Sequence, residues 1–129
     1  MENVDSSTNV PHPRILVVDD EAAIRDVLKR LLRNQPVSVT CAEGGAAALN
    51  LLESGLRPRL ILLDIDMPGM NGWQVLERLK QDPGLASIPV VIISGVHRSG
   101  DVDGVACYLP KPFSLNELLA VIREHAAPS

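Results

Sequence analysis

The chain has 129 residues, a length typical of one domain and too short for two. Hydrophobic residues make up 46% and charged residues 22%, while the aromatic share of 2% means that the core must be aliphatic. The net charge of −4 provides no basic footprint, so we expect no direct binding to nucleic acid or to an anionic membrane.

The chain shows no sign of a membrane segment. No stretch reaches the ~20 apolar residues needed to span a bilayer, and the first residues lack the basic start and apolar middle of a signal peptide. Cys41 and Cys107 lie in or beside apolar runs, without the spacing of a metal site. We therefore expect a cytoplasmic protein with two buried, reduced thiols.

The polar residues 1–13 are predicted to be a flexible N-terminal tail, followed by one domain over residues 14–126 and a short tail at 127–129. Apolar runs predict strands at 15–18, 37–41, 60–63, 90–93 and 105–109, and helical spacing predicts helices over 24–32, 46–52, 75–79 and 115–122. Asn71-Gly72 breaks the chain before the third helix, and Ser114 with Glu117 forms a capping box before the last. This alternation predicts an α/β fold with a doubly wound parallel sheet of five strands and helices on both faces.

Polar side chains follow four of the five predicted strands. They are Asp19 and Asp20 after the first, Asp64 and Asp66 after the third, Ser94 after the fourth and Lys111 after the fifth. Because ligands of open α/β sheets bind outside the carboxyl ends of the strands, we expect these side chains to converge at one edge.

Crowded carboxylates repel one another unless a cation holds them together, and Mg²⁺ prefers oxygen ligands of this kind. Phosphoryl transfer depends on positioning and on neutralising the charge of the phosphoryl oxygens. Mg²⁺, Lys111 and Ser94 would supply that neutralisation, which leaves Asp64 as the nucleophile.

Simpler interpretations exist for several of these residues. Asp19 and Asp20 could only cap a helix or complement its dipole. Ser94 before Gly95 could only end a strand in a turn, and Tyr108 could be a static core residue. The presence of all the charged positions together favours a metal site.

Four segments in order carry a resemblance to a known family. They are ILVVDDE, ILLDIDMPGMNG, VVIISG and YLPKPF, spread over residues 14–126. In this order they resemble the signature segments of bacterial receiver domains, the phosphorylated modules of two-component response regulators. The resemblance implies a flavodoxin-like fold with strand order 2-1-3-4-5. It also implies a switch that a sensor histidine kinase or a phosphotransfer protein phosphorylates and that loses the phosphoryl group slowly, rather than a turnover enzyme.

The resemblance also implies a role for each site residue. Asp64 would be the phosphoacceptor, Asp19 and Asp20 the acidic pair on Mg²⁺, and Asp66 a metal ligand through its backbone carbonyl. Ser94 would hydrogen-bond the phosphoryl group and act in the switch, Lys111 would form an ion pair with it, Tyr108 would be the switch aromatic, and Lys111-Pro112 would be a cis peptide.

Two alternatives come from other classes. Asp64-Ile65-Asp66 also resembles the nucleophile motif of haloacid-dehalogenase-type phosphatases, although the early Asp19-Asp20 pair argues against it. The other is a degenerate receiver that acts only as a constitutive binding module. The chain also departs from the family in residues 96–104, where the family usually has a fourth helix of about three turns. This segment carries two glycines and too few apolar residues for such a helix, so we expect that helix to be shortened or absent.

Overall fold

The computed structural model describes residues 12–67, 69, 71–95 and 105–126. Nearly all of the two predicted tails lies outside this description. Residues 96–104 do too, so the expectation of a shortened or absent helix there stays a prediction.

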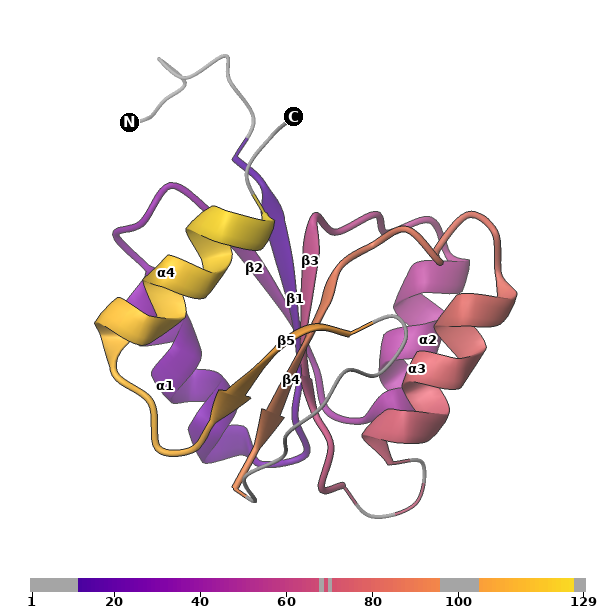
Figure 1. The fold of residues 1–129 in the computed structure, drawn as a ribbon, viewed down its shortest axis with the longest axis horizontal. Coiled ribbons are helices and arrows are strands. Elements are labelled where there is room, and N and C mark those ends of the chain that lie inside the picture. Colours follow the sequence, from indigo (N-terminus) through magenta and orange to yellow (C-terminus); the bar gives the residue numbers. More distant parts are fainter. Residues whose placement is uncertain (1–11, 68, 70, 96–104, 127–129) are drawn as a thin grey trace.

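The described chain forms a single sheet with helices on both of its faces (Figure 1). Its strands are β1 (Arg14–Val18), β2 (Ser38–Ala42), β3 (Leu60–Asp64), β4 (Val90–Ser94) and β5 (Val105–Pro110). The helices of the described part are α1 (Ala22–Leu32), α2 (Gly45–Glu53), α3 (Gly72–Gln81) and α4 (Leu115–His125). Every strand pair is parallel, and the order β2-β1-β3-β4-β5 confirms the predicted doubly wound sheet.

The sheet separates two aliphatic cores because successive strand residues point to opposite faces. Leu16 and Val18 pack with α2 and α3, whereas Ile15 and Val17 pack with α1 and α4. Figure 1 shows the same division, with α1 and α4 on one side of the sheet and α2 and α3 on the other. The inner strands β3 and β4 are buried along their whole length, as their continuous apolar runs predicted.

Local sequence signals explain where two of the helices begin. Ser114 and Glu117 form the predicted capping box of α4. Asn71 and Gln74 form a second capping box on α3, which the sequence analysis did not identify. Gly72, interpreted as part of a chain break, is the first residue of that helix.

One sequence expectation needs correction. Cys41 and Cys107 are free thiols, but both are half-buried rather than buried. Cys41 lies on the edge strand β2 and Cys107 on the edge strand β5, where the sheet has a neighbouring strand on one side only. Burial still raises the pKa of each thiol above its ordinary value.

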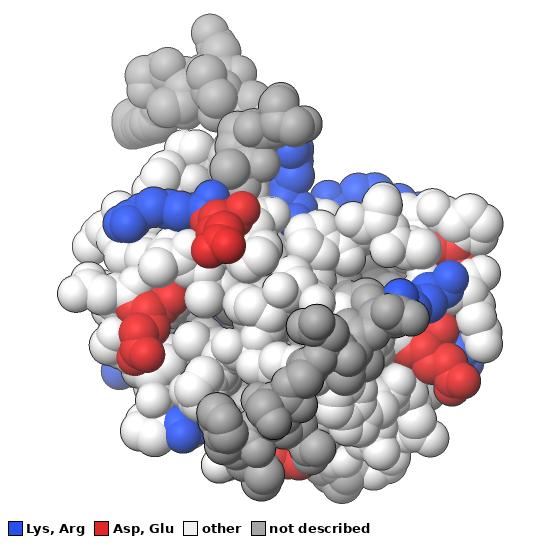
Figure 2. All heavy atoms as spheres, in the orientation of Figure 1, with Lys and Arg blue, Asp and Glu red and all other residues white. Residues whose placement is uncertain are grey.

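The surface carries charges of both signs. Figure 2 shows lysine and arginine side chains interspersed with aspartate and glutamate over the visible face, rather than gathered by sign.

None of the helices in the described part of the chain has the length and apolar character that a membrane crossing requires.

Candidate functional site

Three carboxylates meet at the carboxyl edge of the sheet. Asp64 is the last residue of β3, Asp19 directly follows β1, and Asp20 is its neighbour. One oxygen of each lies within 4.8 Å of the other two. Asp19 and Asp64 are only 1% and 2% exposed, whereas Asp20 faces solvent. The topology therefore brings together three of the four acidic side chains that the sequence predicted to converge, and Asp66 is not among them.

Among the described residues, Lys111 is the cation that forms ion pairs with this cluster. Its Nζ lies 3.6 Å from Asp64 Oδ1 and 3.9 Å from Asp19 Oδ2, and a quarter of its side chain is exposed. The turn after β5 carries Lys111 to this position, and its peptide bond with Pro112 is cis, as the family resemblance implied. A single ammonium group cannot neutralise three carboxylates, so these four described side chains together keep an excess of carboxylates over cations.

The backbone holds the two buried carboxylates in similar ways. Asp19 Oδ1 accepts a hydrogen bond of 2.9 Å from the Glu21 N–H, and Asp64 Oδ1 accepts one of 3.1 Å from the Asp66 N–H. Glu21, rather than Asp19 or Asp20, occupies the N-cap position of α1. The helix-cap interpretation of the Asp19-Asp20 pair therefore lacks support.

Burial decides the electrostatics of both residues. Desolvation raises the pKa of Asp64 and outweighs the lowering effects of the Asp66 N–H and of Lys111. Desolvation likewise raises the pKa of Asp19, against the lowering effects of the Glu21 N–H and of Lys111. The charged form of each group is therefore destabilised by burial, and a further positive charge would relieve that cost.

The donor set fits a hard divalent cation. Asp19 Oδ2 is buried and has no hydrogen-bond partner among the residues that the structure describes, which is unusual for a carboxylate oxygen. Mg²⁺ takes one or two carboxylates and fills its other positions with water and phosphate oxygens. Asp19, Asp20 and Asp64 supply carboxylate oxygens at suitable spacing, and the exposure of Asp20 leaves a path for water.

The remaining predicted residues surround this cluster. Ser94 ends β4 and is 2% exposed, and its carbonyl accepts a 2.9 Å hydrogen bond from the Lys111 N–H. Tyr108 is half-buried on β5, where it pairs with Ile92 and packs against the core on the α2–α3 side. The Asp66 side chain is exposed. Their positions agree with the predicted roles, which stay predictions.

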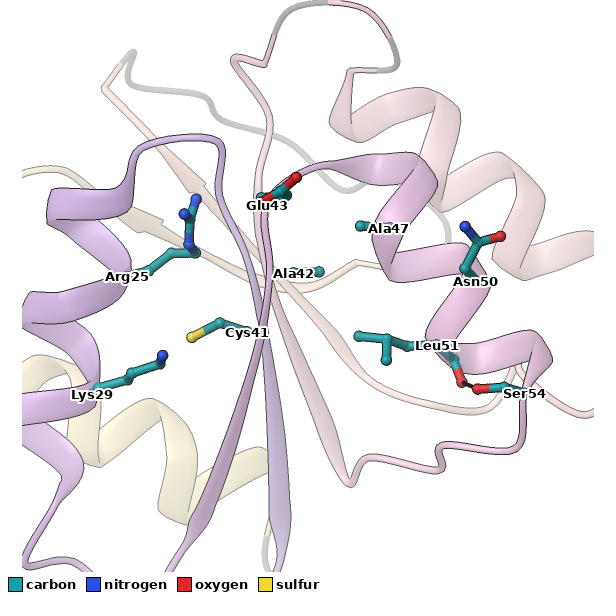
Figure 3. Close-up of a pocket in the computed structure, with 9 residues that line it drawn as sticks. All are labelled: Arg25, Lys29, Cys41, Ala42, Glu43, Ala47, Asn50, Leu51 and Ser54. Atoms are coloured by element: carbon teal, nitrogen blue, oxygen red, sulfur yellow. Dashed lines mark hydrogen bonds between the residues drawn. The ribbon is translucent and has the colours of Figure 1, made fainter.

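Arg25 also contacts the site, although the sequence analysis did not single it out. Its guanidinium donates a 2.7 Å hydrogen bond to the Asp19 carbonyl and so ties α1 to the turn that carries Asp19 and Asp20. Arg25 and Lys29 line an open groove of about 580 Å³, which Cys41 of β2 and residues of α2 also line. Figure 3 shows both side chains extending from α1 toward β2. An arginine on an amphipathic helix has no motif around it, so only the fold reveals this contact.

An acidic cluster and a lysine at the carboxyl edge of a 2-1-3-4-5 parallel sheet define a receiver-type domain. The sequence model of the response regulator receiver domain matches residues 15–123. The chain therefore belongs to this family, whose members are signalling switches of two-component systems rather than turnover enzymes and generally bind Mg²⁺ at an acidic pocket.

Individual relatives agree with this assignment. The chain is 39% identical over 115 residues to the response regulator MprA of Mycolicibacterium vanbaalenii, covering 85% of this chain and 48% of that protein. It thus spans about half the length of the curated relative it matches. The receiver domain of the Francisella response regulator 1452 superposes with a TM-score of 0.80 at 28% identity, over 89% of this chain and 97% of that one. Vibrio cholerae CheY4, at 24% identity and a TM-score of 0.82 over 88% and 98%, shares the fold.

Proposed function

We propose that the chain is a phosphorylation-dependent switch in which Asp64 accepts a phosphoryl group from a phosphohistidine of a sensor kinase or phosphotransfer protein. The observation that carries this proposal is the pairing of Asp64 with Lys111 at 3.6 Å inside a cluster of three carboxylates. A buried carboxylate beside a lysine and a predicted metal site has the features of an activated nucleophile.

In the proposed reaction, a carboxylate oxygen of Asp64 forms a bond to phosphorus. The bond between phosphorus and the histidine nitrogen of the donor breaks, and its electron pair returns to the imidazole. Asp19, Asp20 and Asp64 would hold Mg²⁺, with the Asp66 carbonyl as a further ligand. When bound, Mg²⁺ neutralises charge on the phosphoryl oxygens.

The chain's own residues supply the rest of the electrostatics. Lys111 stands beside Asp64 and would form an ion pair with the phosphoryl oxygens once the carboxylate becomes an acyl phosphate. The Ser94 hydroxyl would donate a hydrogen bond to the same group. Because the Ser94 carbonyl accepts the Lys111 N–H, movement of either residue would be transmitted between β4 and β5. Tyr108 on β5 would then respond to phosphorylation as the switch aromatic. The phosphoryl group would be lost slowly.

The partner would reach this site over an apolar groove beside it. This groove of about 430 Å³ is lined by Ile24, Val27, Leu28 and Leu31 of α1 and by residues 111–113. Val27 is 48% exposed, the one large hydrophobic side chain exposed to this degree in the described chain. Because Lys111 both lines the groove and contacts Asp64, a donor protein seated there would stand next to the acceptor. Val27→Glu should slow transfer from the kinase and leave phosphorylation by acetyl phosphate unchanged.

Intact-mass spectrometry after incubation with acetyl phosphate and Mg²⁺ tests the acceptor. We expect a mass gain of one phosphoryl group that maps to Asp64, is absent in Asp64→Asn, and is lost when EDTA removes the metal. Label that persists in Asp64→Asn would contradict the assignment. Absence of any label would favour the constitutive binding module, and steady hydrolysis of a phosphate monoester would favour the phosphatase alternative.

A further inference from the structure

Gly72 lies against the backbone of the predicted acceptor strand. A Cβ at this position would lie 2.7 Å from the Ile65 Cα and 2.9 Å from the Asp64 carbonyl oxygen. Non-bonded carbon atoms normally approach to about 3.5–4.0 Å. Both obstructing atoms belong to the main chain, so they cannot turn aside as the end of a flexible side chain can. Any other residue at position 72 therefore requires the backbone to move.

Hydrogen bonds hold both sides of this contact in place. The Gly72 N–H donates to the Ile65 carbonyl at 3.3 Å, and the Ile65 N–H donates to the Ile93 carbonyl of β4 at 3.2 Å. The capping box of Asn71 and Gln74 anchors the first turn of α3, and this helix buries its apolar face in the core. A displacement caused at position 72 would therefore pass into the end of β3.

The limited space at position 72, rather than its backbone conformation, explains why a glycine is present there. The positive φ angles of the described glycines occur at Gly55 and Gly69, whereas Gly72 has an ordinary helical position. Alanine is a better helix former than glycine by up to about 1 kcal/mol, so local propensity favours a side chain at this position. The absence of one must then serve the close approach of α3 to Asp64 and Ile65.

We propose that Gly72 is a positioning residue of the acceptor site: it lets α3 pack at the distance that keeps Asp64 in register with Asp19, Asp20 and Lys111. This inference rests on the proposed function. Moving a Cβ from 2.7 Å to an ordinary contact requires a shift of about 0.8 Å. Metal-ligand distances vary by only about 0.2 Å, and a misplacement of ~1 Å can slow a reaction about a hundredfold.

The test compares Gly72→Ala with Gly44→Ala in the full chain. Gly44 is also at a helix start, as the N-cap of α2, and a Cβ there meets no atom within 4 Å. We expect Gly72→Ala to weaken Mg²⁺ binding, measured by calorimetry without any phosphodonor, by about tenfold or more. Phosphorylation by acetyl phosphate should slow by a similar factor at saturating Mg²⁺. Gly44→Ala should match the wild type in both measurements.

A crystal structure of metal-free Gly72→Ala supplies a second readout, and we expect Asp64 to be displaced relative to Asp19. A role in packing alone would lower the melting temperature while leaving Mg²⁺ affinity and the phosphorylation rate of the folded protein unchanged. That result would overturn the proposal. If Gly72→Ala does not fold, Asn71→Ala loosens the same turn without a clash, and unchanged Mg²⁺ affinity in that variant would also overturn it.

The outcomes separate this inference from the proposed function. A wild-type chain that binds no Mg²⁺ and accepts no phosphoryl group contradicts the proposed function and the positioning role together. A wild-type chain that does both, with Gly72→Ala indistinguishable from Gly44→Ala, contradicts the positioning role alone.

Discussion

Compared with the wild type, the Asp20→Ala variant should be more stable without metal and less stable in excess Mg²⁺. Asp20 is the exposed member of the acidic cluster, and its carboxylate lies close to those of Asp19 and Asp64. Its removal relieves repulsion in the folded state without opening a cavity. The same change removes a predicted Mg²⁺ ligand.

The structure sets the size of this effect. The carboxylate oxygens lie within 4.8 Å of one another. At that separation two unit charges repel by about 3 kcal/mol at an effective dielectric constant of ~20 and by about 1 kcal/mol in bulk water. Because Asp20 is exposed, the lower value applies to each of its two pairs. Losing a negative charge before α1 costs about 0.3–1 kcal/mol. The relief of repulsion is larger than this cost, so the free energy of unfolding of the metal-free protein should rise by about 1 kcal/mol.

Urea unfolding in EDTA measures this gain, which corresponds to a rise of about 3–5 °C in melting temperature. Excess Mg²⁺ should reverse the order, because a ligand stabilises the form that binds it more tightly. Glu77→Ala is the matched control, since it removes an exposed charge on α3 outside the cluster. A marked loss of metal-free stability in Asp20→Ala, or an equal gain in Glu77→Ala, would refute the reasoning.

Three further predictions follow from the same geometry. Burial raises the pKa of Asp64 above its ordinary value of 3.8, so the folded state binds a proton at higher pH than the unfolded state. In EDTA, urea unfolding should therefore find Asp64→Asn more stable than the wild type at pH values above the raised pKa, with the difference shrinking as pH falls through it. Arg25→Ala should weaken Mg²⁺ binding, measured by calorimetry, about tenfold because it frees the Asp19 carbonyl, whereas Lys29→Ala on the same helix face should not. Ser94→Ala should keep its Mg²⁺ affinity yet lose the phosphorylation-dependent change in amide exchange that we expect over β5.

Each of these predictions has a contradicting result. A stability advantage of Asp64→Asn that grows on acidification would mean that the Asp64 carboxylate is stabilised in the folded state. Equal Mg²⁺ affinities for Arg25→Ala and Lys29→Ala would mean that the Asp19 turn needs no support from α1. An unchanged amide-exchange response in Ser94→Ala would mean that the Ser94 hydroxyl has no role in the switch.

The sequence by itself determined the alternation of strands and helices and the residues that end the strands. Runs such as 60–63 are apolar at every position, which only a strand buried on both faces tolerates, and parallel connections then place Asp19, Asp64 and Lys111 at one edge. These are consequences of local pattern and chain direction, so one sequence suffices to predict them. The order of charged residues also identified the family.

Contacts between segments distant in the sequence were decided only by the tertiary structure. Whether Asp19 Oδ2 has a hydrogen-bond partner, besides its ion pair with Lys111, depends on how β1, β3 and the turn after β5 pack. No local sequence pattern encodes that packing. The half-burial of Cys41 follows from β2 lying at the sheet edge, and its apolar neighbours in sequence do not report that position. Gly72 looked like a chain break because a glycine in sequence signals backbone freedom. Its actual constraint is the space between α3 and β3, and that space exists only once the two elements have packed together.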